Sequence, residues 1–362
     1  MIKPASSLCN MRCCYCFYAD VSSLRTVQNY GMMSHETVKK MLEHVFFDLE
    51  DGDKITFCFQ GGEPTLAGIA FFQMFVDEVQ IRKKGVLVRY TLQTNGTLLN
   101  ELWCKFFKEH CFLIGLSLDA MAGNHNKNRV TASGEETFKT VLAAKKLLEA
   151  HHVEYNILTV LTEQLARHPR QAWSFLEKER IRYIQFIPCL SSLHSEAAAP
   201  CSLTPKQFAT FYTDLFQIWY REFLKNNYIS IKLFDDVLSL LSAGQQNACG
   251  MMGRCLPQIV VEADGSTYPC DFYVLDEFCT GNLTQMTLRQ IYEHPNMRKF
   301  REAYQEKSAH CESCRFSGIC GGGCKRMRRE VYCAPGMDSC GYEEFLNACI
   351  GELQQLARWL RK

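Results

Sequence analysis

Three cysteines near the N-terminus have the spacing of an iron–sulfur site. Cys9, Cys13 and Cys16 follow a C-x3-C-x2-C pattern within one short loop. Three thiolates on such a loop can bind three corners of a cubane [4Fe–4S] cluster and leave the fourth iron without a protein ligand. An open metal position is typical of a catalytic site, whereas structural sites are closed. The alternatives are a zinc knuckle, buried cysteines, or Cys14 in place of Cys13; we favour a cluster held by Cys13.

A second motif, Gln60-Gly61-Gly62-Glu63-Pro64, directly follows a predicted strand. Two glycines let the backbone approach a ligand closely, and Glu63 can accept a hydrogen bond from an ammonium group. A Gly-Gly pair before a proline is by itself more often an ordinary turn. Its position one strand after the cysteine loop makes a ligand-binding segment the better interpretation.

The C-terminal part of the chain holds a hairpin that can gather further cysteines. Asp264-Gly265 is typical of a two-residue hairpin turn, and pairing about that turn sets Cys270 opposite Ile259 and returns it close to Cys255. Three thiolates can then converge at the open end of the hairpin, those of Cys249, Cys255 and Cys270.

Five more cysteines follow the hairpin with regular spacing. They form C-x2-C-x5-C-x3-C and then, after fifteen intervening residues, one more: Cys311, Cys314, Cys320, Cys324 and Cys340. Cys333 is a rival to Cys340 that the spacing leaves open. Zinc also uses C-x2-C pairs, but zinc ribbons do not explain eight cysteines beside the N-terminal loop, so we favour iron–sulfur clusters.

The elements that position these motifs are predicted by alternating apolar runs and amphipathic stretches. Strands are expected at 2–5, 55–59, 88–93, 112–118, 153–160 and 183–187, with helices between them at 34–49, 67–82, 101–110, 135–151 and 163–180. Six βα units without an internal hairpin imply an α/β fold with a parallel sheet. Six units are too few for an eight-stranded barrel, so we expect a partial (β/α)6 barrel with its chemistry at the carboxyl ends of the strands.

The rest of the chain divides into helices and the cysteine-rich module. Thr204-Pro205 is an N-cap followed by a first-turn proline, which predicts a helix to about residue 225, and further helices are expected at 233–242 and 342–360. We therefore predict a partial barrel over residues 1–200, linking helices over 201–244 and a cysteine-rich domain over 245–362.

Composition excludes several classes of protein. The 362 residues carry 40 basic and 39 acidic side chains, and this balance argues against a nucleic-acid surface or a polybasic membrane patch. No apolar run is long enough to span a membrane, and the N-terminus lacks the apolar core of a signal peptide. Twenty cysteines in a long chain with helix and strand periodicity indicate metal binding in a reducing cytoplasm.

The motifs together resemble those of radical S-adenosylmethionine (SAM) enzymes. The resemblance begins with Tyr15-Cys16-Phe17-Tyr18 and the Gln60–Pro64 segment, and the later cysteines resemble a SPASM domain with two auxiliary [4Fe–4S] clusters. The closer similarity is to anaerobic sulfatase-maturating enzymes. It covers essentially the whole chain, through the segments 2–7, 57–66, 92–97 and 268–273.

The resemblance implies three [4Fe–4S] clusters and S-adenosyl-L-methionine as cofactors. The first auxiliary cluster would be held by Cys249, Cys255, Cys270 and Cys324, and the second by Cys311, Cys314, Cys320 and Cys340. The residues assigned to S-adenosyl-L-methionine are Tyr15, Gln60, Gly61, Gly62, Glu63, Ser117, Arg129 and Leu190. Without the resemblance, Arg129 would be interpreted as a solvated surface charge.

The implied reaction is the oxidation of a cysteine or serine in an unfolded sulfatase polypeptide to Cα-formylglycine. A 5′-deoxyadenosyl radical would abstract the Cβ hydrogen, Asp271 would take the thiol or hydroxyl proton as the catalytic base, and the auxiliary clusters would take the second electron. Without the resemblance, a carboxylate hydrogen-bonded to the hairpin backbone is an equal interpretation of Asp271. We further expect a cytoplasmic monomer that receives electrons from a donor such as ferredoxin or flavodoxin.

Two other classes of function compete with this one. Another SPASM peptide maturase, for example one that forms thioether crosslinks in a ribosomal peptide, would use the same clusters. A non-enzymatic electron-transfer protein or zinc scaffold would not need the Gln60–Pro64 segment or an open iron.

Overall fold

The computed structural model describes residues 1–194, 199, 201–303, 308–334 and 336–361. Contacts divide the chain into two compact units. The first unit comprises Met1–Leu118, Asn126–Tyr155 and Pro257–Ala303, and the second comprises Asp119–His125, Asn156–Leu256 and Tyr304–Lys362. The units are interleaved along the sequence, and the domain boundaries predicted at residues 200 and 244 stay predictions.

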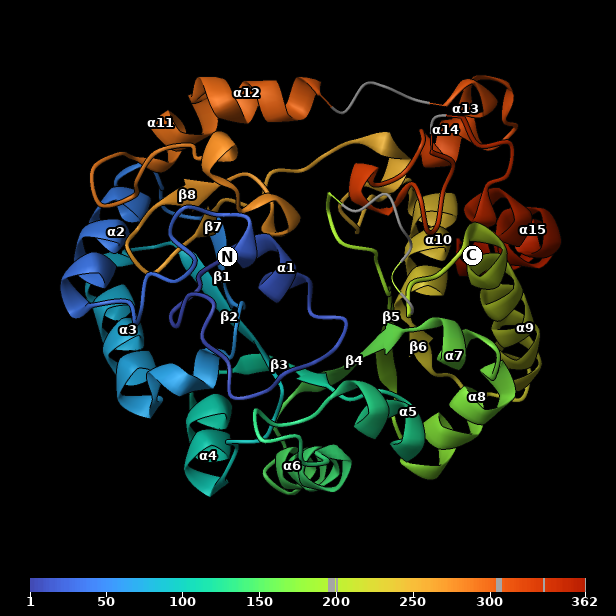
Figure 1. Cartoon of the computed structure of the whole chain (residues 1–362), viewed down its shortest axis with the longest axis horizontal. Coiled ribbons are helices and arrows are strands. Elements are labelled where there is room, and N and C mark those ends of the chain that lie inside the picture. Colours follow the sequence, from blue (N-terminus) through green and yellow to red (C-terminus); the bar gives the residue numbers. More distant parts are fainter. Residues whose placement is uncertain (195–198, 200, 304–307, 335, 362) are drawn as a thin grey trace. The chain divides into compact units, whose positions relative to one another are not determined.

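The first unit is built on three parallel strands with helices beside them (Figure 1). The strands β1 (Lys54–Phe59), β2 (Leu87–Thr94) and β3 (Phe112–Ser117) pair in chain order. The helices before, between and after them are α2 (His35–Phe47), α3 (Ile69–Arg82), α4 (Glu101–Glu109) and α6 (Phe138–Ala150). The Ser34 hydroxyl caps α2 by accepting a hydrogen bond from the Thr37 N–H.

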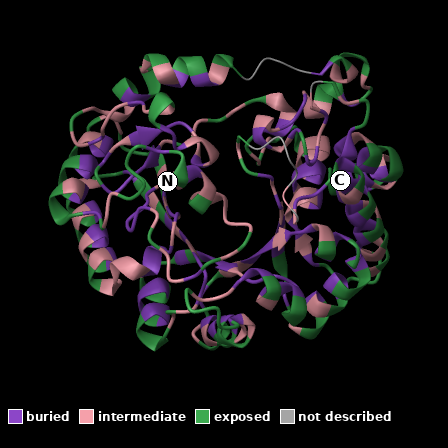
Figure 2. Ribbon diagram, in the orientation of Figure 1, coloured by how far each residue is buried: buried purple, intermediate pink, exposed green. Residues whose placement is uncertain are grey.

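Aromatic rings fill the space between this sheet and α3. Phe57 and Phe59 lie two residues apart on β1, so both face the same side, and Phe72 and Phe75 lie three apart on α3. The Phe59 ring centroid is 4.9 Å from those of both helix residues, and all four side chains are at most 5% exposed. The buried colouring of the strands in Figure 2 follows from this pattern.

The second unit also contains three parallel strands in chain order, β4 (Tyr155–Leu161), β5 (Tyr183–Pro188) and β6 (Ser230–Ile231). Helices α8 (Pro169–Lys178), α9 (Pro205–Phe223), α10 (Lys232–Ala243) and α15 (Gly341–Leu360) pack around a core of rings that includes Trp219, Phe234 and Phe345. Thr204 and Gln207 form a capping box at the start of α9, with Pro205 at the first helical position.

The remaining elements are short. They are α1 (Phe17–Ser23), α5 (Ala122–Asn128), α7 (Glu163–Ala166), α11 (Leu288–Glu293), α12 (Pro295–Glu302), α13 (Ala309–Ser313), α14 (Ser317–Cys320), β7 (Val260–Val261) and β8 (Thr267–Tyr268), and the 3-10 turns η1 (Pro64–Ala67), η2 (Met251–Gly253), η3 (Asp271–Tyr273), η4 (Asp276–Phe278) and η5 (Lys325–Met327). Among the described residues, no helix is long and apolar enough to cross a membrane.

The prediction of six parallel strands has the right number, and five of the six are confirmed, but one is wrong. Residues 2–5 do not form a strand: Ile2 makes isolated bridges to Phe59 and Val261, and Pro4 has no N–H to extend a ladder. The sixth strand is instead β6, which pairs with β5 through only two residues and is too short to show periodicity. The single helix predicted at 163–180 is two helices, because Pro169 starts α8 with no N–H to donate.

The hairpin also differs in register from the prediction. The loop has three residues, because the Glu262 N–H donates to the Ser266 carbonyl, and Gly265 closes it with a φ of +90°. Val260 therefore pairs with Tyr268. Ile259 has a φ of +44°, and the Gln258 N–H donates to the Pro269 carbonyl, so the ladder is bulged here. The predicted pairing of Cys270 with Ile259 is wrong.

Candidate active site and cysteine clusters

The N-terminal cysteine loop lies in the first unit, directly before α1. Cys9, Cys13 and Cys16 are all partly exposed. The neighbouring Cys14 turns elsewhere: its N–H donates to the Asn128 carbonyl and its Sγ lies 3.0 Å from the Asn128 Oδ1. This contact supports Cys13 over Cys14 as the second cluster ligand.

Asn95, at the end of β2, connects the cysteine loop to the rest of the site. Its N–H donates to the Glu63 Oε2 over 2.7 Å, and its Nδ2 donates to the Asn10 Oδ1 over 2.8 Å while lying 4.0 Å from the Cys9 Sγ. In the sequence, Asn95 lies in the segment 92–97 that carries the family resemblance, but no role is predicted for it. The structure adds Asn95 as the residue that positions the loop. Burial raises the pKa of the Cys9 thiol, so it becomes a ligand only where a metal stabilises the thiolate.

Glu63 is 1% exposed and is bound on both oxygens by the protein. Oε1 accepts hydrogen bonds from the Thr65 N–H and hydroxyl and from the Thr94 hydroxyl, and Oε2 accepts one from Asn95. Burial nevertheless raises the pKa of its carboxyl. Glu63 thus connects η1 to the end of β2, and a contact from its carboxylate to a cofactor ammonium stays a prediction.

The two glycines before Glu63 occupy positions that exclude a side chain. Gly62 has a φ of +54°, and a Cβ there would lie 2.2 Å from the Leu8 carbonyl oxygen. Gly61 has a φ of +104°, and its Cβ would overlap the methylene chain of Lys3. The segment can therefore lie close beside the residues that precede the cysteine loop only because both residues are glycine.

The other residues assigned to S-adenosyl-L-methionine fall into two groups. Arg129 is 7% exposed, which contradicts a solvated surface charge; its Nη1 lies 3.4 Å from the Tyr15 hydroxyl, and its charge acts on the Cys9 thiol. Ser117 is half-buried at the end of β3 in the same unit. Leu190, also half-buried, follows β5 in the second unit. Arg129 and Tyr15 thus adjoin the cysteine loop, as the prediction requires.

Asp271 is 5% exposed and contacts Gln60, the first residue of the Gln60–Pro64 segment. Its Oδ2 accepts a hydrogen bond of 2.5 Å from the Tyr18 hydroxyl and one of 3.0 Å from the Gln60 Nε2. Its Oδ1 lies 3.3 Å from the Lys3 Nζ. Tyr18 stays a donor, because burial and the neighbouring carboxylate hold its pKa well above the ordinary value. The structure therefore places the predicted base beside two residues that flank the cysteine loop and the glycine pair.

Three of the four cysteines assigned to the first auxiliary cluster lie together in the second unit. A hydrogen bond from Cys255 lowers the pKa of Cys249 to about 6, and the charge of Cys249 acts on Cys324. A Cβ at Gly250 would lie 2.7 Å from the Cys324 Cβ, so the backbone approaches this thiol closely. Cys270 belongs to the first unit, where it precedes η3.

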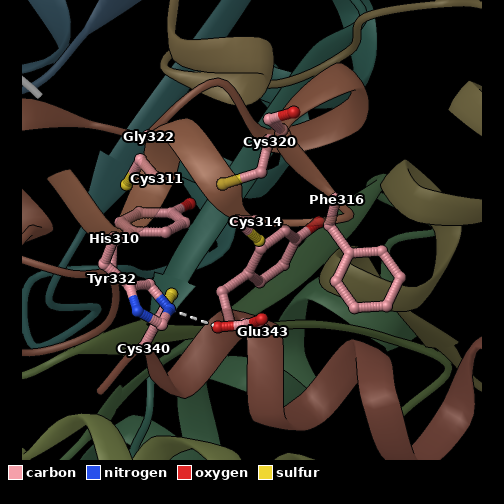
Figure 3. Close-up of a pocket in the computed structure, with 11 residues that line it drawn as sticks. His310, Cys311, Cys314, Phe316, Cys320, Gly322, Tyr332, Cys340 and Glu343 are labelled. Carbon is pink, nitrogen blue, oxygen red and sulfur yellow. Dashed lines mark hydrogen bonds and ion pairs between the residues drawn. The ribbon is translucent and has the colours of Figure 1, made fainter. Parts of the chain in front are cut away.

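All four cysteines assigned to the second auxiliary cluster line one hollow of about 340 Å³ in the second unit (Figure 3). Burial raises the pKa of Cys320 to about 12 and that of Cys340 to about 11. The rival Cys333 is 1% exposed and does not line the hollow, and its Sγ lies 3.0 Å from the Met337 carbonyl oxygen. The lining thiols are those of Cys311, Cys314, Cys320 and Cys340, which supports Cys340 as the fourth ligand.

The donor sets fit clusters of the expected kind. Three thiols stand on the N-terminal loop and four around the hollow, and a cubane cluster binds each thiolate through a separate iron. Within the described ranges, no three His, Cys, Asp or Glu side chains are gathered as they would be around a single metal ion.

Comparison with known proteins agrees with this geometry. Residues 4–167 match the radical SAM superfamily, and residues 249–315 match an iron–sulfur cluster-binding domain called SPASM. A cysteine-type anaerobic sulfatase-maturating enzyme of Clostridium novyi is 38% identical over 99% of this chain and 97% of its own. One of Clostridium perfringens is 41% identical over 91% of this chain and 89% of its own.

A solved structure of native anSMEcpe with bound AdoMet and Cp18Cys peptide matches 99% of this chain and 98% of its own, with a TM-score of 0.92 and 38% identity. Fold and site therefore define a radical SAM enzyme with a C-terminal SPASM domain, and the predicted fold class is confirmed. The chain belongs to the family of anaerobic sulfatase-maturating enzymes.

Proposed function

We propose that this enzyme oxidises a cysteine in an unfolded sulfatase polypeptide to Cα-formylglycine. The observation that carries the proposal is the position of Asp271. Its carboxylate accepts hydrogen bonds from Tyr18, which follows the cysteine loop, and from Gln60, which precedes the glycine pair. The clostridial relatives are cysteine-type enzymes, which favours cysteine over serine as the target residue.

The chain has residues to hold each group that the reaction needs. Cys9, Cys13 and Cys16 would hold the N-terminal cluster, and Arg129 would pair with the carboxylate of S-adenosyl-L-methionine in a bidentate contact. The other proposed contacts of this cofactor come from Tyr15, Gln60, Gly61, Gly62, Glu63, Ser117 and Leu190. When bound, the cofactor and its cluster supply a carbon radical that can abstract a hydrogen atom.

The substrate cysteine must lose three things to become a thioaldehyde: the Cβ hydrogen atom, the thiol proton and one electron. Asp271 would take the proton as the S–H bond breaks, and Oδ1 is the oxygen available for it, because Oδ2 already accepts two hydrogen bonds. The electron would pass to the auxiliary sites, whose four cysteines each leave no open iron for a substrate. Water then converts the thioaldehyde to the aldehyde of formylglycine and releases sulfide.

The proposed function also implies an electron donor and a cellular setting. We infer an electron donor of the ferredoxin or flavodoxin type, because the N-terminal cluster must be reduced before each cleavage. We also infer a monomer in a reducing cytoplasm, where twenty cysteines and exposed clusters would stay intact.

The proposal is tested by anaerobic incubation of the reconstituted enzyme with S-adenosyl-L-methionine, a reductant and matched sulfatase peptides that carry cysteine or serine at the target position. Mass spectrometry should show formylglycine in the cysteine peptide, with 5′-deoxyadenosine formed in step. A crosslinked peptide, or cofactor cleavage with an unmodified peptide, would contradict the proposal.

A further inference from the structure

A buried lysine that the reaction scheme leaves unused reaches into the candidate active site. Lys3 is 4% exposed, and its Nζ lies 3.3 Å from the Asp271 Oδ1 and 3.7 Å from the Glu262 Oε1. The same nitrogen lies 4.8 Å from the centroid of the Tyr18 ring, on its face. A lysine is rarely buried to this degree unless it is paired, so its place here requires an explanation.

The path of the Lys3 side chain depends on the first glycine of the glycine pair. A Cβ at Gly61 would lie 2.7 Å from the Lys3 Cγ, 2.9 Å from Cδ and 3.0 Å from Cε. The methylene chain therefore runs directly over the Gly61 backbone on its way to Asp271. The absence of a side chain at Gly61 therefore leaves room for this lysine, in addition to letting the backbone approach a ligand.

A second buried carboxylate holds the ammonium group from the other side. Glu262 is fully buried; its Oε1 accepts a hydrogen bond of 2.6 Å from the Arg25 Nη1, and its Oε2 accepts one of 2.8 Å from the Ser6 hydroxyl. Two cations, Lys3 and Arg25, thus face two carboxylates, Glu262 and Asp271, and the N-terminal ammonium of Met1 also interacts with the charge of Asp271. Pairing of this kind is what allows ionised groups to remain buried.

The two oxygens of Asp271 have different surroundings. Oδ2 accepts hydrogen bonds from Tyr18 and Gln60, whereas the buried Oδ1 accepts none, and its charged neighbour is Lys3. An ion pair at 3.3 Å that makes no aligned hydrogen bond fixes the carboxylate while leaving the lone pairs of Oδ1 available. The arrangement orients Oδ1, which is buried, and leaves it without a hydrogen-bond donor.

We propose that Lys3 is a positioning residue for the base, which holds the Asp271 carboxylate so that Oδ1 faces the substrate thiol, and that Glu262 in turn holds Lys3. The inference rests on the proposed function of Asp271. Lys3 touches neither the cysteines of the loop nor the substrate in this account; it acts through Asp271.

The test compares Lys3→Met with Lys3→Arg in the full-length, reconstituted enzyme. Lys3→Met keeps the length and the apolar stem of the side chain but removes the charge, whereas Lys3→Arg restores a cation. Lys145→Met is the matched control, because Lys145 is a buried lysine of the same unit, 2% exposed, with a single carboxylate partner, Glu149, at 2.8 Å.

For Lys3→Met we expect kcat for formylglycine to fall by about tenfold to a hundredfold, the usual consequence of a misplaced catalytic group. The KM for the peptide, the iron content and the formation of 5′-deoxyadenosine should stay near the normal values, and Lys3→Arg should recover part of the lost coupling. Lys145→Met should retain normal coupling. Normal coupling in Lys3→Met, or loss of iron or of cofactor cleavage in it, would overturn the proposal.

Two further variants separate this inference from the base assignment. If Lys3 acts through Asp271, the double variant Lys3→Met/Asp271→Asn should lose no more formylglycine than Asp271→Asn alone. A further multiplicative loss would overturn the role of Lys3 while leaving the base assignment intact. Normal activity of Asp271→Asn alone would overturn the base assignment itself. Glu262→Gln, which keeps its shape, should show the Lys3→Met effect in weaker form.

Discussion

The N-terminal cysteine loop and the C-terminal hollow use the same type of ligand in two different settings. The loop offers three thiols, and its neighbours are polar or charged: Asn95 beside Cys9, and Arg129 against Tyr15. The hollow offers four thiols, and its lining includes both aromatic rings, such as that of Phe316, and the His310–Glu343 pair. The two sites therefore differ in the number of thiols: three leave one iron open to bind another molecule, whereas four suit a cluster that only passes electrons.

The largest expected effect comes from removing the three-thiol set. Replacing Cys9, Cys13 and Cys16 together by alanine should abolish cleavage of S-adenosyl-L-methionine and remove about a third of the roughly twelve irons that three [4Fe–4S] clusters contain. Iron and sulfide analysis with an assay for 5′-deoxyadenosine checks both. Zinc in the C-terminal module, with only the N-terminal irons present, would break the comparison.

The next effect separates cofactor cleavage at the loop from the later steps on the substrate. Asp271→Asn keeps size and hydrogen-bonding capacity but removes the basic carboxylate, so formylglycine formation should fall by ~10²–10⁴. Formation of 5′-deoxyadenosine and the iron content should persist, measured by chromatography and by iron analysis. Loss of iron would instead make Asp271 a structural support of the Cys270 segment. Normal maturation would mean that the thiol proton goes elsewhere, and Tyr273 would be the next group to test.

Single cysteine variants test which thiol is the fourth ligand of the second auxiliary cluster. Cys340→Ala should destabilise the second auxiliary cluster and release close to a third of the total iron, because its thiol lines the hollow. Cys333→Ala is the matched control, since its thiol lies against the Met337 carbonyl away from the hollow. Iron loss in the Cys333 variant and none in the Cys340 variant would reverse the assignment.

The smallest expected effect concerns the binding of S-adenosyl-L-methionine. Arg129→Ala removes a buried guanidinium from the neighbourhood of Tyr15 and Cys9. Loss of a charge-assisted bidentate contact costs ~1.5–3 kcal/mol, so S-adenosyl-L-methionine should bind tenfold or more weakly in equilibrium titration. Unchanged affinity would show that Arg129 serves the loop's packing only.

The sequence predicts the parallel α/β fold, because the periodicity of long apolar runs and amphipathic helices is visible in the residue types. It fails where elements are short or depend on distant partners. Residues 2–5 resemble a strand, yet only Ile2 pairs, whereas β6 is a two-residue strand whose partner lies more than forty positions earlier. The bulge at Ile259 likewise depends on a positive φ, which the pattern of residue types does not predict.

The candidate site divides in the same way. Cysteine spacing and the glycine pair are local signals: four of the cysteines line one hollow, and both glycines have a positive φ. The contacts around Asp271 are not local: Lys3, Tyr18 and Gln60 come from separate segments and meet only in the folded chain. Glu63 also has contacts that its motif does not predict, because its carboxylate accepts four hydrogen bonds from the protein, and its contact with the cofactor stays a prediction.

The most direct test of the account is a side-by-side anaerobic assay of the wild type and the Asp271→Asn variant on a cysteine-containing sulfatase peptide. Each reaction is analysed for 5′-deoxyadenosine and, by mass spectrometry, for formylglycine. The account predicts that the wild type forms both products in step, and that the variant forms 5′-deoxyadenosine with almost no formylglycine. A wild-type enzyme that cleaves the cofactor but leaves the peptide's cysteine unchanged would contradict it.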